Sequence, residues 1–318
     1  MATSGTSVLT VTRDDVIRQA MLNIGALDGD EVPTPRETLD CSLILNMLVK
    51  QWQGRSDFAP GLKTWKRRRS NLFLSTSSGQ YTVGPSAVGW TESFVKTSLG
   101  SAASGGDSSI NLAIGTPPWV ALGNYIGIQL ASGDMQWTTV SLVVGTVVSL
   151  TDLLLGNASQ GAPVYYYTTT ANQPLNLEAV VLRDSNGNDL PLKIMTQQEF
   201  DSLPSKAAVG NQGDPTAVYY EFQRINSNLF IDSNGVVDVT RYLVLTYLEA
   251  IQSLINPLDE LEYTQEWYLP LCWGLAKQIA PMFHMDFTQQ MESVFTTSLS
   301  VAQHKEAEVS RMFFQGSE

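Results

Sequence analysis

The chain has 318 residues, 43% of which are apolar, and it carries a formal net charge of −12 at neutral pH. This length and composition allow a buried core and predict one large domain with a smaller one. A general nucleic-acid binder is expected to be basic, so the charge argues against a protein whose whole surface clamps DNA. The sequence contains neither a transmembrane run nor a signal peptide, and we expect residues 1–11 to form a flexible arm.

Residues 12–25 predict a first amphipathic helix that begins at Thr12 and ends at Gly25. An acidic linker, residues 26–33, leads into a second helix over residues 34–54. The two helices are expected to form a helical hairpin.

The second helix has the clearest signals in the chain. Thr34 suits the N-cap and Glu37 completes a capping box, while Gly54 suits the C-terminal end. Apolar residues cover most of its circumference at about 100° per residue. We therefore expect either a deep core position or a core on one side and a neighbouring subunit on the other. The residues predicted for that subunit interface are Leu43, Met47, Leu48 and Trp52.

A basic run follows this helix. Its cations are Lys63, Lys66, Arg67, Arg68 and Arg69. They are candidates for contact with DNA phosphates or with an acidic protein partner. The alternative is a solvated strand edge, where positive charge discourages pairing with other chains.

Residues 101–170 begin with a linker rich in Ser and Gly and continue as short segments rich in Val, Ile, Tyr and Thr. Their spacing predicts an inserted, small antiparallel β-barrel of about five strands. The segment has no Lys or Arg, and its acids are Asp107, Asp134 and Asp152. Such low charge suggests that part of the surface is covered by another subunit or a partner, although an ordinary polar surface is the alternative.

Hairpin signals predict a mixed β region over residues 173–246, and the C-terminal part is helical in pattern. Helical spacing runs from Leu261 to Ile279, with Pro270 either kinking the helix or marking a later start. A last helix is expected from Phe287 to Phe313. It ends in Met312, Phe313 and Phe314, which form either a docking plug or ordinary packing.

The predicted fold class is α+β. A helical hairpin and long C-terminal helices form a bundle, accompanied by the mixed β region and the inserted barrel. The expected domains are the arm 1–11, a helical and β core made of 12–100 with 171–285, the barrel 101–170, and a C-terminal helix with a docking tail, 286–318.

We find no persuasive catalytic motif in the sequence, and we expect no enzyme, no cofactor and no metal site. His284 and Asp286 alone are too few ligands for a metal centre. Asp259, Glu260 and Glu262 are better explained as favourable charge at a helix N-terminus than as catalytic carboxylates. The two cysteines, Cys41 and Cys272, are expected to be buried free thiols, with a disulfide as the alternative.

The chain contains, in this order, the segments Ile17–Gly25 with Leu43–Trp52, Gly213–Tyr220, and Glu262-Tyr263 leading to Gly274–Ala276. In the order and texture of these segments, most of residues 12–285 resembles the head-to-tail adaptor (connector) proteins of tailed bacteriophages, mainly short-tailed ones.

The resemblance implies a structural virion protein that forms a ring, commonly a dodecamer, beneath the portal. The ring would join head to tail, retain the genome and provide the channel for its ejection. The implied partners are further copies of the chain, the portal protein, downstream tail or nozzle proteins, and double-stranded DNA that passes without sequence-specific binding. The implied location is the neck of the virion, after synthesis in the host cytoplasm, with no membrane contact. Portal docking is expected of Met312, Phe313 and Phe314.

Two alternatives remain at this point. The first is a tail-associated glycan-binding or cell-wall-degrading protein, in which Trp90, Trp119 or Trp137 would offer a sugar platform. The second is a subunit of the tail tube.

Overall fold

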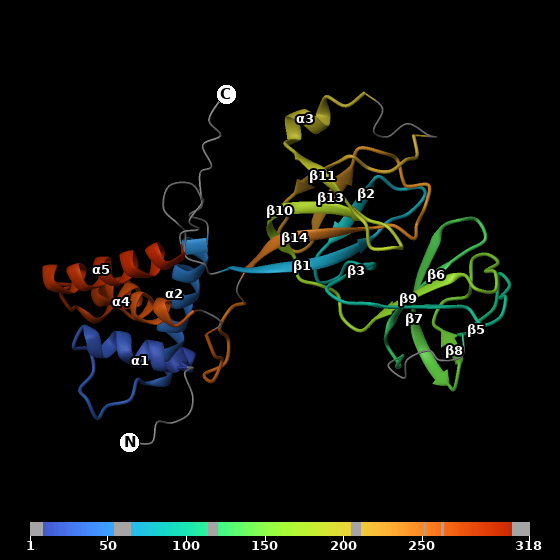
Figure 1. The fold of residues 1–318 in the computed structure, drawn as a ribbon. Coiled ribbons are helices and arrows are strands. Elements are labelled where there is room, and N and C mark those ends of the chain that lie inside the picture. The colour runs from blue at the N-terminus through green and yellow to red at the C-terminus, as the bar shows by residue number, and fades with distance from the viewer. Residues whose placement is uncertain are drawn as a thin grey trace, which may run out of the picture. The chain divides into compact units, whose positions relative to one another are not determined.

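The computed structural model describes residues 9–53, 65–113, 120–204, 211–250, 252–261 and 264–306; of residues 65, 66, 250 and 304–306 only the backbone is described. The chain divides into two units, Met1–Lys66 with Ala250–Glu318, and Arg67–Glu249. We call their described parts the helical unit and the β unit, and Figure 1 shows the elements of each.

The two ends of the chain form the helical unit. Within it, α4 packs against each of the other three α-helices, and the core is built from buried side chains of all four. The helices are α1 (Arg13–Asn23), α2 (Pro35–Gln53), α4 (Tyr268–Ile279) and α5 (Gln289–Glu306), with short 3-10 helices η1 (Gln265–Trp267) and η2 (Ala280–Phe283).

Both N-terminal helices begin where the sequence predicts. The backbone N–H of Asp15 donates to the Thr12 hydroxyl, and the Thr12 N–H donates to the Asp15 carboxylate at 3.0 Å. Thr34 and Glu37 make the same reciprocal pair, with the Thr34 N–H donating to Glu37 at 2.8 Å. Each pair satisfies backbone donors that the first turn leaves without an intrahelical partner.

The larger sheet of the β unit has eight strands in the order β2-β13-β12-β11-β10-β14-β1-β3. The pairs β1–β3, β10–β11, β10–β14, β12–β13 and β13–β2 are antiparallel. β11 and β12 are parallel, and the short helix α3 (Gln197–Asp201) lies between them in the sequence. The strands are β1 (Trp65–Phe73), β2 (Gln80–Val83), β3 (Trp90–Thr91), β10 (Pro174–Arg183), β11 (Asp189–Met195), β12 (Ala217–Glu221), β13 (Ser227–Ile231) and β14 (Tyr242–Ala250).

The second sheet has six strands in the order β4-β9-β6-β7-β8-β5 and nearly closes into a barrel. The chain just after β4 meets the end of β5, because the Gly100 N–H donates to Asn111 O at 2.8 Å and Ala113 N–H donates to Ser98 O at 2.9 Å. Closure protects the strand edges. The strands are β4 (Val95–Ser98), β5 (Ser109–Asn111), β6 (Tyr125–Gln129), β7 (Met135–Val144), β8 (Val147–Leu150) and β9 (Pro163–Tyr167).

An aromatic cluster joins the two sheets. The ring of Phe73, on β1, lies 5.0 Å from the ring of Trp137 and 4.8 Å from that of Tyr165, centroid to centroid. Trp137 in turn packs over Gly127, where an added Cβ would come within 2.8 Å of the indole. Aromatic rings bury a large apolar area, so these contacts are a substantial part of what holds the β unit together.

The structure corrects the predicted fold class, which is wrong. The protein is mostly β, and the described residues contain no bundle of long C-terminal helices. α4 has 12 residues and begins only at Tyr268, so that Pro270 falls in its first turn, where a missing N–H breaks no helical hydrogen bond. Pro281 then lies in η2, which separates α4 from α5.

The predicted domain boundaries stay a prediction. In the described residues, no helix is long and apolar enough to cross a membrane.

Candidate subunit interface

One face of α2 belongs to the core of the helical unit. Leu45, Leu48 and Trp52 are all buried on this face. The Trp52 ring stacks on Phe295 of α5, with centroids 6.3 Å apart and planes 25° apart. The same ring lies against Gly274 of α4, where an added Cβ would be 2.7 Å from the indole. This face of α2 is therefore directed toward α4 and α5.

The opposite face of α2 exposes a row of large apolar side chains. Leu39, Leu43 and Met47 are 68%, 58% and 59% exposed. At about 100° per residue, their average direction lies roughly 180° from that of Leu45 and Trp52. We call these three residues the outer stripe. They are four positions apart, which places neighbouring side chains about 5–6 Å from one another.

The four predicted interface residues thus fall on two different faces. Leu43 and Met47 lie on the outer stripe, whereas Leu48 and Trp52 pack inside the helical unit. Sequence reasoning missed Leu39 as a member of the exposed row, although its spacing of four residues from Leu43 was the signal. An interface role for the predicted residues stays a prediction.

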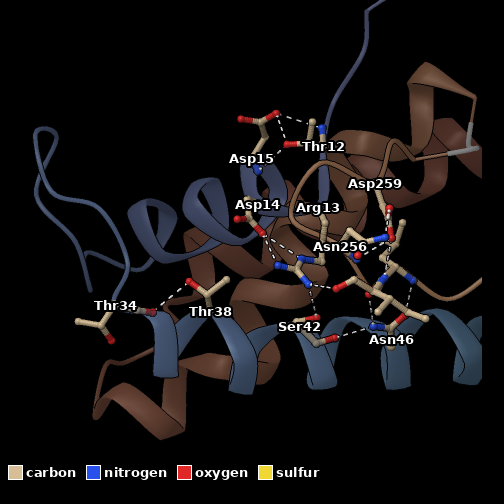
Figure 2. Close-up of polar contacts among 12 residues, drawn as sticks. Thr12, Arg13, Asp14, Asp15, Thr34, Thr38, Ser42, Asn46, Asn256 and Asp259 are labelled. Carbon is tan, nitrogen blue, oxygen red and sulfur yellow. Dashed lines mark hydrogen bonds and ion pairs between the residues drawn. The ribbon is translucent and has the colours of Figure 1, made fainter.

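A buried cation fixes the position of α1 against its neighbours. Arg13 is only 5% exposed, and its guanidinium donates to Ile255 O at 2.5 Å and to the Ser42 hydroxyl at 3.4 Å, as Figure 2 shows. It also pairs with the Asp14 carboxylate at 2.8 Å. A buried charge without partners is costly, so these contacts specify one arrangement of α1, α2 and the segment before α4.

The segment 252–261 is tied to α2 by a side-chain amide (Figure 2). Asn46 donates to Leu254 O at 3.0 Å and accepts from Leu254 N–H at 2.9 Å. Asp259 accepts backbone N–H bonds from Asn256 and Ile255, each at 2.7 Å. The hydrogen bonds from Asn256, followed by that from Ile255, lower the pKa of the Asp259 carboxyl. α2 therefore presents the outer stripe from an anchored position.

A second apolar surface lies between α4 and α5, and we call it the α4–α5 groove. Its apolar side chains are Leu269, Val294 and Val301, which are 53%, 44% and 62% exposed. The groove has a volume of about 450 Å³. The remaining lining residues are polar: Glu266, Ser293, Thr297 and Ser298.

Two cations of the basic run are paired with carboxylates inside the β unit. Arg67 makes a two-point contact with Glu178, at 2.6 and 3.0 Å, and Arg68 donates to Glu249 at 3.0 Å. Paired arginine and carboxylate groups are well matched in geometry. Arg69 is exposed. Lys63 and the side chain of Lys66 lie outside the described residues, and contact of the run with DNA or an acidic partner stays a prediction.

Other predicted residues are less accessible or fall outside the described part. Met312, Phe313, Phe314 and Trp119 lie outside the described residues. Trp90 is fully buried and its indole N–H donates to Asn172 O at 3.1 Å, so it offers no platform for a sugar.

Cys41 and Cys272 are free and buried. Burial, followed by the nearby charges of Asp40 and Glu37, raises the pKa of Cys41 to about 11. Burial, followed by the charge of Asp15, raises that of Cys272 to about 12. Both thiols are therefore poor nucleophiles at neutral pH.

Within the described ranges, no group of three or more His, Cys, Asp or Glu side chains converges in a way that could hold a metal ion. Comparison of the sequence with protein-family models and with curated proteins gave no match.

Proposed function

We propose that the protein is a non-catalytic structural subunit that assembles into a ring at the head-to-tail junction of a tailed bacteriophage. The observation that carries the proposal is the two-faced helix α2. One face fills the core, and the other exposes Leu39, Leu43 and Met47 from an anchored position. Contiguous exposed apolar side chains mark protein interaction sites. The resemblance of the sequence to head-to-tail adaptors suggests which assembly this surface serves.

The charge of the protein supports a role around DNA that does not require tight binding. Each copy carries a formal charge of −12. A ring of such copies would line a channel with negative potential, which repels phosphates and lets DNA slide. The pairing of Arg67 with Glu178 and of Arg68 with Glu249 is consistent with this, because it neutralises two of the five cations of the basic run.

The β unit offers a separate surface for a different partner. At the β7–β8 hairpin, Leu142, Val144 and Val147 are exposed around a turn at Gly145. These apolar side chains belong to a segment that has no Lys or Arg. Portal protein on one side and tail or nozzle proteins on the other would require more than one such surface.

Electron microscopy of the purified protein mixed with the portal protein of the same phage tests the proposal. We expect rings of this chain on the portal. Turnover of cell-wall polymers, assayed in parallel, should be undetectable. Measurable turnover together with an absence of rings would favour the cell-wall-degrading alternative and would overturn the proposal.

A further inference from the structure

We propose that the outer stripe of one copy seats in the α4–α5 groove of a second copy, so that the subunits associate head-to-tail through their helical units. The inference rests on the ring proposed above, and it names the two surfaces that would build the ring. Leu39, Leu43 and Met47 supply one surface, and Leu269, Val294 and Val301 supply the other.

The groove of a given copy cannot receive the stripe of the same copy. The core face of α2 carries Trp52, which packs on Phe295 of α5 and against Gly274 of α4. The outer stripe points in the opposite direction on the same helix. Because α2 is held in this orientation by its core contacts, a stripe that fills the groove must come from another molecule.

The two surfaces match in length and in chemistry. From Leu39 to Met47 the stripe extends about 12 Å along α2, and from Val294 to Val301 the groove extends about 10 Å along α5, at 1.5 Å per residue. Leu269, Val294 and Val301 give the groove a mainly apolar lining. Thr297 and Ser298 lie between the two valines on the same side of α5, so their hydroxyl groups would fall within the contact, and the Ser298 hydroxyl already donates to Phe295 O at 2.9 Å.

Charge favours this pairing over contact between two stripes. The exposed charged side chains along this side of α2 are Arg36 and Lys50, three residues beyond either end of the stripe, and Asp40, next to Leu39. Among the described residues that line the groove, Glu266 is the one with a charge, and its sign is opposite. Two stripes packed antiparallel would instead bring Arg36 of one copy near Lys50 of the other. Like charges in such a contact disfavour it.

Two unlike surfaces on one molecule produce a heterologous contact. Each copy then uses its stripe on one neighbour and its groove on the other. Repetition of such a contact gives a closed ring when the rotation between copies permits closure, and an open filament when it does not. No further interface between copies is therefore needed for a ring to form.

Complementary variants test the inference directly. Leu43→Asp disables the stripe and Val301→Asp disables the groove. Both positions are exposed, so each variant should keep the fold, which circular dichroism can check. Each variant alone should associate about ten-fold more weakly or worse, because the contact would bury an unpaired carboxylate. Val32→Asp, at an exposed apolar residue outside both surfaces, should associate like the unaltered protein.

Mixing the two variants gives the decisive result, measured by sedimentation velocity at high protein concentration. Leu43→Asp retains a groove and Val301→Asp retains a stripe, so an equimolar mixture should form a one-to-one pair that grows no further. If Val301→Asp alone still forms dimers and the mixture forms no pair, two stripes meet each other and the inference is wrong. If the pair is lost when both variants end at Glu306, the segment 307–318 of one copy is required for the contact, and the inference is wrong.

Failure of this inference can be told apart from failure of the proposed function. If the unaltered protein forms rings on the portal and both variants do so equally well, the ring stands but these surfaces do not build it. If the one-to-one pair forms while the unaltered protein makes no ring on the portal, the contact stands and the proposed function falls. A protein that remains monomeric both at high concentration and with the portal overturns both.

Discussion

Replacement of Gly274 by alanine tests how tightly the core face of α2 is packed. Gly274 is buried in α4, and an added Cβ would lie 2.7 and 2.8 Å from two atoms of the Trp52 indole and 3.3 Å from a methyl group of Leu48. The Leu48 methyl group can shift. The indole is held by stacking on Phe295, so it cannot withdraw easily.

Two effects of Gly274→Ala oppose each other. Alanine in a helix interior is favoured over glycine by about 1 kcal/mol. Overpacking a well-packed core costs about 1–3 kcal/mol, and two ring atoms closer than ordinary contact place this site toward the upper end. We therefore expect the helical unit to lose about 1–2 kcal/mol of unfolding free energy.

Urea denaturation, monitored by the helical circular dichroism signal, measures this change in unfolding free energy. The same substitution is also made in a Trp52→Phe variant as the matched background. Phenylalanine lacks the outer part of the indole, so Gly274→Ala in that background should be neutral or stabilising by up to about 1 kcal/mol. The difference between backgrounds is the coupling of the two sites. A stabilising effect of Gly274→Ala in the unaltered protein would refute the packing reasoning and would show that the ring moves freely.

Three further predictions concern the helical unit. Arg13→Met should destabilise it by about 1–3 kcal/mol in the same denaturation assay, because buried acceptors lose their donor, and Arg13→Lys should recover part of the loss. Hydrogen bonds hold the pKa values of Asp15 and Asp259 below the ordinary value for an aspartate. The stability that these two carboxylates contribute is therefore present above about pH 4 and should be lost as the pH falls through their pKa values in the folded protein. For Asp259, an acid titration of stability that is unchanged in Asp259→Asn would contradict this. Cys41 and Cys272 should react slowly with a thiol reagent at pH 8 in the native protein and rapidly in urea, because burial raises their pKa values; equal rates would show that the thiols are accessible.

The local signals of the sequence were sufficient to place the starts of α1 and α2. Thr12 and Thr34 each bond to a carboxylate three residues later, and such caps depend on neighbours in the chain alone. The apolar pattern of α2 predicted a helix covered on more than one side; one face is buried in the core, and cover of the exposed face stays a prediction. The pattern did not show which side faces the core, since that depends on Phe295 and Gly274, which lie far away in the sequence.

The proportions of helix and strand could not be predicted from local signals in the sequence. Helical spacing between Leu261 and Phe313 predicted long helices, but α4 begins at Tyr268 and η2 interrupts the pattern. The pairing of β14 with β10 and β1 joins segments that are distant in the chain, and strand periodicity does not encode such partners. Arg67 likewise pairs with Glu178, which lies 111 residues away in the sequence, so the position of Arg67 within the basic run did not reveal the ion pair.

Native mass spectrometry of the protein, alone and mixed with the portal protein of the same phage, tests the ring most directly. The account predicts a complex in which about a dozen copies of this chain are bound to the portal, as expected of a closed cyclic assembly. A chain that stays monomeric at every concentration and leaves the mass of the portal unchanged would contradict it.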